Sequence, residues 1–205
     1  MHKLLPVAVI LGLAMLLAWL VVGWQPAADN DGAHSALGLA AEPTGGDFRL
    51  HAADGPVDLV DLRGKVILIY FGYTWCPDIC PTNLAIIALA LRALEPAELR
   101  QVQVLFVSVD PERDTPQRLQ EYAAYFHPAI LGVTGNPAEI ARAAALYGAA
   151  YRRAEESDSA MGYSVDHSAY TYVVDPRGRL VATLDHATPS ETLIATIRAH
   201  LSDDG

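Results

Sequence analysis

Residues 66–81 read VILIYFGYTWCPDICP and join an apolar run to the only two cysteines of the chain. Residues 66–71 are apolar without interruption and rich in β-branched and aromatic side chains, which predicts a buried central strand. Cys76 and Cys80 follow directly, and Pro81 suits the first turn of a helix. The stretch therefore predicts a strand, a short loop with both cysteines, and a helix.

Further apolar runs and helix caps on either side of this stretch predict alternating strands and helices. The expected strands are a hairpin within 48–59, runs at 66–71 and 102–109, a short run around 129–133, and a hairpin of 169–174 and 179–184. The expected helices follow Pro81 and span about 116–126, about 137–147, and about 190–201. A parallel βαβ start with a hairpin and a helix at the end is what a thioredoxin-like fold requires. The predicted class is α/β, thioredoxin-like, with an N-terminal β-hairpin.

The composition limits the kinds of protein that this chain can be. Its 205 residues suit one domain plus an appendage. Two cysteines are too few for a disulfide scaffold or a four-cysteine zinc site. With 24 acidic and 14 basic residues, the formal net charge is -10, which argues against nucleic acid as a partner because phosphates need a basic face.

An apolar segment near the N-terminus accounts for the high hydrophobic content of 52%. Residues 4–22 carry no charge and would span roughly 28 Å as a helix, about one bilayer core. Lys3 precedes this segment and the next basic residue is Arg49, so the N-terminus is expected to stay in the cytoplasm. We expect one transmembrane helix as an anchor within residues 1–24. A cleaved signal peptide is the alternative.

The anchor sets the expected organisation of the rest of the chain. Residues 25–44 are rich in Ala, Gly, Asp and Pro and predict a flexible tether. Residues 45–203 form the expected thioredoxin-like domain. This domain would lie in the periplasm, on a single-pass anchor in the inner (cytoplasmic) membrane.

The two cysteines lie where the central strand meets its helix, at the edge where α/β folds place their sites. Regular helical spacing would put their Cβ atoms about 5–6 Å apart, farther than the about 3.5–4.5 Å of a disulfide. Pro77 and Pro81 bias Cys76 and Cys80 away from helical geometry, so we expect a loop with Cys80 near the helix cap. Such a loop could close a disulfide or direct two thiolates at a metal. Plain packing, or a merely stabilising disulfide, is the alternative.

His167 is the candidate third ligand. It directly precedes the predicted strand 169–174, which is expected to run antiparallel to the cysteine strand and so begins at the same edge of the sheet. Two thiolates and one imidazole form a soft site that selects Cu(I), and with a further ligand the same set can hold Cu(II). A structural zinc site would want four ligands. The predicted metal site is therefore Cys76, Cys80 and His167 with copper.

Five neighbouring residues have two interpretations each. Asp166 could orient the imidazole or serve a turn. Asp110 and Asp114 could face a partner or stabilise a loop and a helix start. Tyr73 and Trp75 could wall the site or pack.

Three segments in order resemble the Sco/SenC family of membrane-anchored copper proteins: GYTWCPDICP at 72–81, DPERDTP at 110–116 and VDHSAYTYVVDPRG at 165–178. The resemblance covers roughly residues 45–203. It implies a thioredoxin-like domain that faces the periplasm, or the intermembrane space in an organelle. It also implies copper on the three predicted ligands, and either delivery of copper to the copper A site of cytochrome c oxidase or reduction of the cysteines of that site.

Two functions are therefore expected. The first is a copper metallochaperone whose partner is the oxidase subunit that carries the copper A site. The second is a periplasmic thiol–disulfide oxidoreductase in which Cys76 and Cys80 are the catalytic pair. Copper delivery ranks first because thiol–disulfide exchange alone does not explain His167.

Overall fold

The structure is a computed structural model that describes residues 12–13, 15–17, 19, 37–154 and 162–201. The chain divides into two compact units, Met1–Ala33 and His34–Gly205, and the few described residues of the first unit are helical. Most of the predicted anchor, and the predicted tether up to residue 36, lie outside the described residues. Among the residues that are described, no helix is both long and apolar enough to cross a bilayer.

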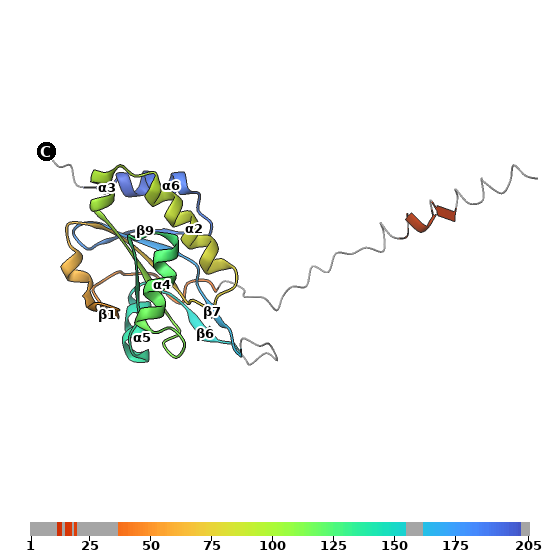
Figure 1. The fold of residues 1–205 in the computed structure, drawn as a ribbon, viewed down its shortest axis with the longest axis horizontal. Coiled ribbons are helices and arrows are strands. Elements are labelled where there is room, and N and C mark those ends of the chain that lie inside the picture. Colours follow the sequence, from red (N-terminus) through yellow and green to blue (C-terminus); the bar gives the residue numbers. More distant parts are fainter. Residues whose placement is uncertain (1–11, 14, 18, 20–36, 155–161, 202–205) are drawn as a thin grey trace, which may run out of the picture. The chain divides into compact units, whose positions relative to one another are not determined.

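A five-stranded sheet in the order β5-β4-β3-β8-β9 forms the centre of the second unit (Figure 1). Strand β3 (Val66–Gly72) runs parallel to β4 (Val102–Ser108), which in turn runs parallel to β5 (Ile130–Val133). On its other side β3 is antiparallel to β8 (Thr171–Val174), and β8 is antiparallel to β9 (Leu180–Leu184). All residues of β3 are buried, which confirms the predicted central strand.

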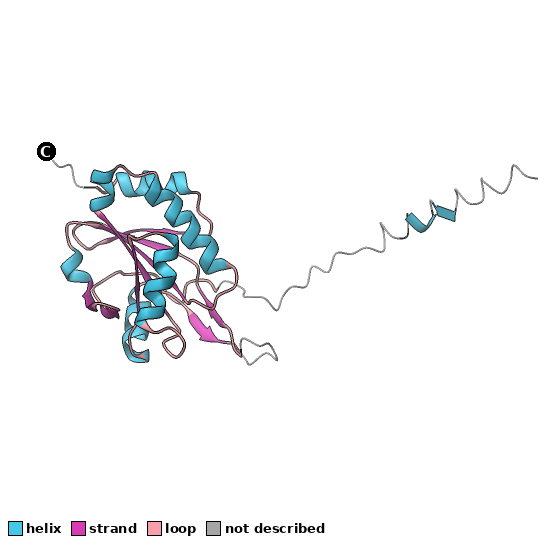
Figure 2. Ribbon diagram, viewed as in Figure 1, coloured by secondary structure: helices cyan, strands magenta, loops and turns pink. Residues whose placement is uncertain are grey.

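Helices pack around this sheet (Figure 2). They are α2 (Ile79–Arg92), α3 (Pro96–Arg100), α4 (Pro116–Phe126), α5 (Pro137–Leu146) and α6 (Ser190–Arg198). Helices α4 and α5 begin at the predicted residues 116 and 137, and the residue before each one caps it: the side chain of Thr115 accepts from Arg118 N–H, and that of Asn136 accepts from Glu139 N–H. Helix α3 and the 3-10 helix η1 (Leu59–Leu62) were not predicted, since both are a single turn without a periodic pattern.

Aromatic side chains fill both faces of the sheet. On one face Tyr70 stacks on Phe106 at 6.2 Å between ring centroids, and Phe106 packs on Tyr122 of α4 at 5.6 Å. On the other face Phe71 packs on Tyr147, which directly follows α5, at 6.2 Å. Successive residues of a strand point to opposite faces, so covering both faces buries the whole of β3 and explains its uninterrupted apolar sequence.

Two small hairpins accompany the sheet. Strands β1 (Arg49–Ala52) and β2 (Gly55–Asp58) form the predicted N-terminal hairpin. Strands β6 (Tyr151–Arg153) and β7 (Val165–His167) pair antiparallel and were not predicted, because three residues are too few to show alternation. His167 therefore ends a short strand of its own, and the expected strand at 169–174 begins only at Thr171.

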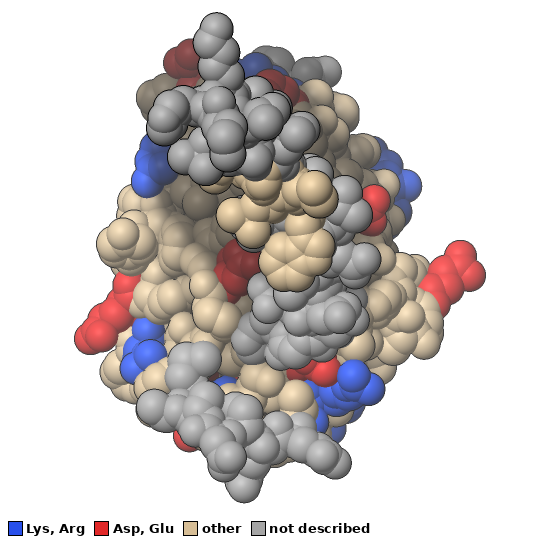
Figure 3. Space-filling model, turned by 90° about the vertical axis from the view of Figure 1, so that its right-hand side faces the viewer, with Lys and Arg blue, Asp and Glu red and all other residues tan. Residues whose placement is uncertain are grey.

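Charged side chains do not gather on the face shown in Figure 3. There, basic and acidic side chains lie interspersed among uncharged ones. Among the described residues, ion pairs also join strands and loops, such as Arg152 with Asp166 at 3.0 Å and Arg153 with Glu112 at 3.2 Å. The described residues on this face thus form no continuous basic patch of the kind that binds phosphates.

The part of the predicted tether that the structure describes, residues 37–44, makes backbone hydrogen bonds to the rest of the unit. Its N–H groups donate to three carbonyls: Leu37 to His167 (3.1 Å), Ala40 to Gly148 (2.8 Å) and Thr44 to Leu146 (3.0 Å). A Cβ at Gly148 would collide with the carbonyl oxygen of Ala41, so the glycine permits this close approach. The segment therefore lies against the strand that ends at His167 and against the end of α5.

We predict that residues 37–44 stabilise the domain. A chain of residues 45–203 loses the three backbone hydrogen bonds, each worth roughly 1 kcal/mol, and should unfold at a temperature about 5 °C or more below that of a chain of residues 37–203. Thermal unfolding followed by circular dichroism compares the two chains. Equal midpoints would contradict the prediction.

Candidate metal centre

Cys76, Cys80 and His167 meet at the carboxyl edge of the sheet, as predicted. Their ligand atoms all lie within 4.8 Å of one another. Cys80 and His167 are 0% and 1% exposed, and Cys76 is 5% exposed, so Cys76 is the one nearest to solvent. In the described parts of the chain, no other group of three His, Cys, Asp or Glu side chains is close enough to hold a metal ion.

The cysteine loop, residues 73–78, joins β3 to α2. Cys76 lies in this loop, and Cys80 lies two residues after the cap residue Asp78, which confirms its predicted place near the cap. Cys80 is nevertheless the second residue of α2, so the expectation that Pro81 would bias it away from helical geometry is wrong. Proline is tolerated here because the first N–H groups of a helix have no partner within the helix. The side chain of the cap residue Asp78 makes no capping bond, and Cys80 N–H donates to the Cys76 sulfur at 3.4 Å instead. The sulfur of Cys76 thus acts as a cap for α2.

Gly72, the last residue of β3, gives the Cys80 sulfur its room. A Cβ at this position would lie 2.6 Å from Cys80 Sγ and 2.9 Å from the Phe106 ring. No other residue type fits without displacing the sulfur. Sequence reasoning missed this residue, although a glycine at the end of an apolar strand is a known sign of close approach.

The imidazole of His167 is oriented for metal binding. Its Nδ1 lies 3.0 Å from the carbonyl oxygen of Ser168, which can only accept, so Nδ1 donates there and Nε2 is the ring nitrogen that faces the cysteine sulfurs. Nε2 lies 3.2 Å from Cys80 Sγ. The rings of Tyr73 and Tyr70 contact the imidazole edge-on, at 5.8 and 6.3 Å between centroids. Nε2 is therefore a ready ligand beside a sulfur.

The structure decides between the two roles considered for Tyr73, for Trp75 and for Asp166. Tyr73 walls the site, but Trp75 is 37% exposed and its ring lies under the guanidinium of Arg118, 4.8 Å from the centroid. Asp166 does not orient the imidazole. It pairs with Arg152 across β6 and β7, and the Ser168 carbonyl holds the ring instead.

The expectation that Asp110 and Asp114 could face a partner is wrong. They are 3% and 1% exposed. Asp110 accepts a hydrogen bond from the Tyr163 hydroxyl at 2.6 Å, and Asp114 accepts one from the Thr74 hydroxyl at 2.6 Å. A buried carboxylate needs such donors. Both residues therefore have the other role considered for them, which is to stabilise a loop and the start of a helix.

The two thiols differ in acidity. Hydrogen bonding by the side chain of Cys80 outweighs the effect of burial and lowers the pKa of Cys76 to about 4. Complete burial, together with the hydrogen bond and the charge of Cys76, raises the pKa of Cys80 well above the usual thiol range. In the metal-free protein the pair therefore holds a thiolate at the more exposed Cys76 and a thiol at the enclosed Cys80. Such a pair can attack a disulfide or bind a soft metal ion.

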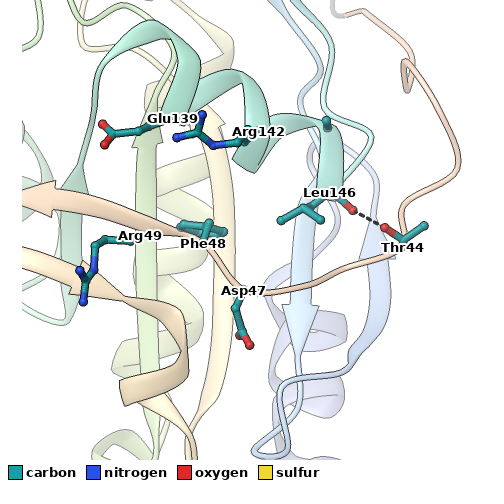
Figure 4. A pocket seen from close by; sticks show the side chains of 8 residues that line it. Thr44, Asp47, Phe48, Arg49, Glu139, Arg142 and Leu146 are labelled. Atoms are coloured by element: carbon teal, nitrogen blue, oxygen red, sulfur yellow. Dashed lines mark hydrogen bonds between the residues drawn. The ribbon is translucent and has the colours of Figure 1, made fainter.

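A separate hollow of about 660 Å³ contains none of these residues (Figure 4). It is lined by Thr44, Asp47, Phe48, Arg49, Glu139, Arg142, Ala145 and Leu146. Two of its charged side chains are paired elsewhere, Arg49 with Asp58 at 3.1 Å and Asp47 with Arg63 at 2.6 Å. No cysteine or histidine lines the hollow, so the candidate metal site is the Cys76, Cys80 and His167 group at the edge of the sheet.

The fold and the site together define a class: a thioredoxin-like domain with two buried cysteines on the loop and helix after its central strand and a buried histidine beside them at the end of β7. Within that class, the sequence model of the SCO1/SenC family matches residues 38–202. The chain therefore belongs to the SCO1/SenC family, as its motifs indicated.

Curated relatives come from plants, bacteria and animals. The chain is 44% identical over 138 residues to Protein SCO1 homolog 1, mitochondrial, of Arabidopsis thaliana, covering 67% of this chain and 41% of that one. It is 39% identical over 136 residues to an SCO2-like protein of Rickettsia conorii, covering 66% of each. It is 39% identical over 159 residues to Protein SCO2 homolog, mitochondrial, of Bos taurus, covering 77% and 59%. The chain thus spans 41% to 66% of the length of these relatives.

Solved structures confirm the thioredoxin-like Sco fold. Copper-bound ScoI of Bradyrhizobium japonicum is 38% identical and superimposes with a TM-score of 0.70, covering 77% of this chain and 99% of that one. Copper-bound yeast Sco1 is 35% identical, with a TM-score of 0.70 and coverages of 80% and 91%. Apo Sco1 of Thermus thermophilus is 40% identical, with a TM-score of 0.70 and coverages of 81% and 97%.

We predict that Gly72→Ala lowers the free energy of unfolding by about 1–3 kcal/mol, because the added methyl group overlaps the Cys80 sulfur and the Phe106 ring. Urea denaturation of the reduced protein measures the change. Gly38→Ala is the matched control, since a Cβ there meets nothing within 4 Å. Equal losses in the two variants would contradict the role of Gly72.

We also predict that Cys76 of the reduced, metal-free protein reacts with iodoacetamide at a rate nearly independent of pH between about 6 and 9. With a pKa of about 4, Cys76 is already a thiolate throughout this range, whereas an ordinary thiol gains reactivity as the pH approaches about 8.5. The Cys80→Ala variant lacks the side chain that mainly lowers the pKa of Cys76. In this variant the reaction of Cys76 with iodoacetamide should become faster as the pH rises. Mass spectrometry follows the alkylation. A steep rise in the unmodified protein would contradict the prediction.

Proposed function

We propose that this protein is a copper metallochaperone that binds copper through Cys76, Cys80 and His167 and delivers it to the copper A site of cytochrome c oxidase during assembly. The observation that carries the proposal is the buried Cys–Cys–His group, whose ligand atoms lie within 4.8 Å of one another. Two sulfurs and an imidazole suit Cu(I), and the same set with a further ligand suits Cu(II). The copper-bound relatives from Bradyrhizobium and yeast support this choice of metal.

The geometry also supports transfer of the metal ion. Three protein ligands leave a coordination position open, and a partner's thiolate can enter there. Cys76 is the ligand nearest to solvent and lies in a loop, while Cys80 and His167 are enclosed. Copper would pass to the partner by stepwise exchange of ligands, beginning on the Cys76 side. The partner is the oxidase subunit that carries the copper A site.

The placement of the chain is part of the same proposal. Residues 1–24 anchor the protein as a single pass in the inner membrane, with the N-terminus in the cytoplasm. Residues 25–44 connect the anchor to the domain at 45–203 in the periplasm. The uncharged run at 4–22 behind Lys3 supports this arrangement. An intact N-terminus in the membrane fraction would support the anchor, and a shortened soluble protein would support the cleaved signal peptide.

A second candidate function, reduction of the cysteines of the oxidase copper site, is favoured by the unequal acidity of the two thiols. The Cys76 thiolate would attack a partner disulfide and form a mixed disulfide. Cys80 would then lose its proton and attack the Cys76 sulfur, releasing the partner's second thiol. The partner gains two electrons, and the Cys76–Cys80 pair ends as a disulfide. His167 has no required part in this exchange.

We predict that Cys76→Ala, Cys80→Ala and His167→Ala each weaken Cu(I) binding by more than about 10-fold, since loss of a direct ligand should cost at least as much as loss of a group that orients one. Anaerobic competition with a chromophoric Cu(I) chelator measures the affinity. His127→Ala is the matched control, because His127 is 9% exposed and its Nδ1 accepts only from Ala129 N–H.

The same variants separate the two functions. Unchanged affinity in Cys76→Ala or His167→Ala would contradict the metallochaperone. If His167→Ala still reduces an oxidised partner peptide at the normal rate while copper binding is lost, reduction is independent of the metal site. No reduction by the unmodified protein would exclude the second function.

A further inference from the structure

Asp114 lies between β4 and α4, and its side chain is fully buried. Its Oδ2 accepts hydrogen bonds from the Thr74 backbone N–H at 2.9 Å and from the Ser108 hydroxyl at 2.7 Å. Its Oδ1 accepts from the Thr74 hydroxyl at 2.6 Å. Two of these three donors belong to Thr74, two residues before Cys76. Asp114 therefore fastens the cysteine loop to a connection that is 40 residues away in sequence.

Arg118, one turn into α4, completes this attachment. Its Nε donates to the Thr74 hydroxyl at 2.7 Å and lies 3.9 Å from Asp114 Oδ1. Its guanidinium also covers the ring of Trp75 at 4.8 Å from the centroid. Thr74 and Trp75 are thus both held from the β4–α4 side.

Tyr73 is held from the opposite side of the loop. Its hydroxyl accepts from Val165 N–H at 3.3 Å, and its ring contacts the imidazole of His167. The three residues before Cys76 are consequently fixed by groups outside the loop. Cys76 itself belongs to no helix or strand, and its backbone N–H makes only a local bond to the Tyr73 carbonyl at 3.3 Å. Apart from the hydrogen bond that its sulfur accepts from Cys80 N–H, the loop next to Cys76 is held by these attachments.

We propose that Asp114 is a positioning residue of the metal site, which holds Thr74 and thereby sets where Cys76 Sγ lies relative to Cys80 Sγ and His167 Nε2. Its significance for copper rests on the proposed function. The geometry that it fixes, however, is a property of the metal-free protein and can be measured there. The role of Asp114 in the geometry of the site and the proposed copper function can therefore be refuted independently of one another.

Three variants of the full chain test the proposal. Asp114→Ala removes every acceptor of Thr74, whereas Asp114→Asn keeps the shape and one acceptor oxygen. Asp175→Ala is the matched control: Asp175 is 4% exposed and accepts from Arg177 N–H, Arg179 N–H and Arg179 Nε at 2.8–3.0 Å. It stabilises the turn between β8 and β9 and touches no residue of the cysteine loop.

Asp114→Ala should weaken Cu(I) binding about 10-fold or more, in the range found for groups that orient metal ligands, and Asp114→Asn should recover part of the loss. Asp114→Ala should also alter the sulfur-to-copper absorption of the Cu(II) form and speed amide exchange at Thr74 in the metal-free protein. Asp175→Ala should lower the unfolding temperature with affinity, absorption and Thr74 exchange unchanged.

Normal affinity and normal Thr74 exchange in Asp114→Ala would overturn the proposal. Equal loss of affinity in Asp175→Ala at matched stability would also overturn it, because the effect would then be general destabilisation. If Asp114→Ala does not fold, Thr74→Val and Asp114→Asn carry the test, and normal affinity in both would refute it. If the unmodified protein binds no copper, the proposed function fails, and the proposal is judged by Thr74 exchange and by the alkylation rate of Cys76 in the metal-free variants.

Discussion

The hydrogen bond from Cys80 N–H to the Cys76 sulfur is the interaction on which the site depends. It begins α2 without a conventional cap and fixes the loop cysteine against the helical one. The side chain of Cys80 supplies the hydrogen bond that mainly lowers the pKa of Cys76, the backbone bond adds to it, and the helix N-terminus contributes its own favourable field. The contacts between the two cysteines therefore start α2 and also keep Cys76 as a thiolate that can bind a metal ion.

The histidine reaches this cysteine pair because β3 and β7, two strands from distant parts of the chain and from different sheets, end close to one another. Cys80 and His167 are separated by 87 residues in sequence, yet Cys80 Sγ lies 3.2 Å from Nε2. Strand β3 delivers the cysteine loop, and β7 delivers the histidine at its last residue. The absence of a side chain at Gly72 allows the sulfur to lie on the sheet. The outcome is a soft donor set that is closed on the inner side and open only near Cys76.

The proposed function requires the site to bind copper tightly and still release it. Enclosure of Cys80 and His167 favours retention, and the position of Cys76 in a loop favours exchange with an incoming thiolate. The loop cannot be loose, however, because thiolate and imidazole must keep their relative distances. The contacts of Tyr73, Thr74 and Trp75 meet both requirements, because they fix the backbone next to Cys76 while Cys76 itself stays nearest to the surface.

The sequence by itself determined the α/β class, most of the strands and helices, the cysteine loop and the place of His167 beside the cysteines. These features follow from periodicity, caps and strand direction, which are local or topological properties. Only the tertiary structure decided the β6–β7 pairing, the helical position of Cys80, the Ser168 carbonyl as partner of the imidazole, and the buried roles of Asp110 and Asp114. The reason is physical: buried polar groups must find hydrogen-bond partners, and the donors they find, such as Thr74 for Asp114, come from segments that only the packed fold brings together.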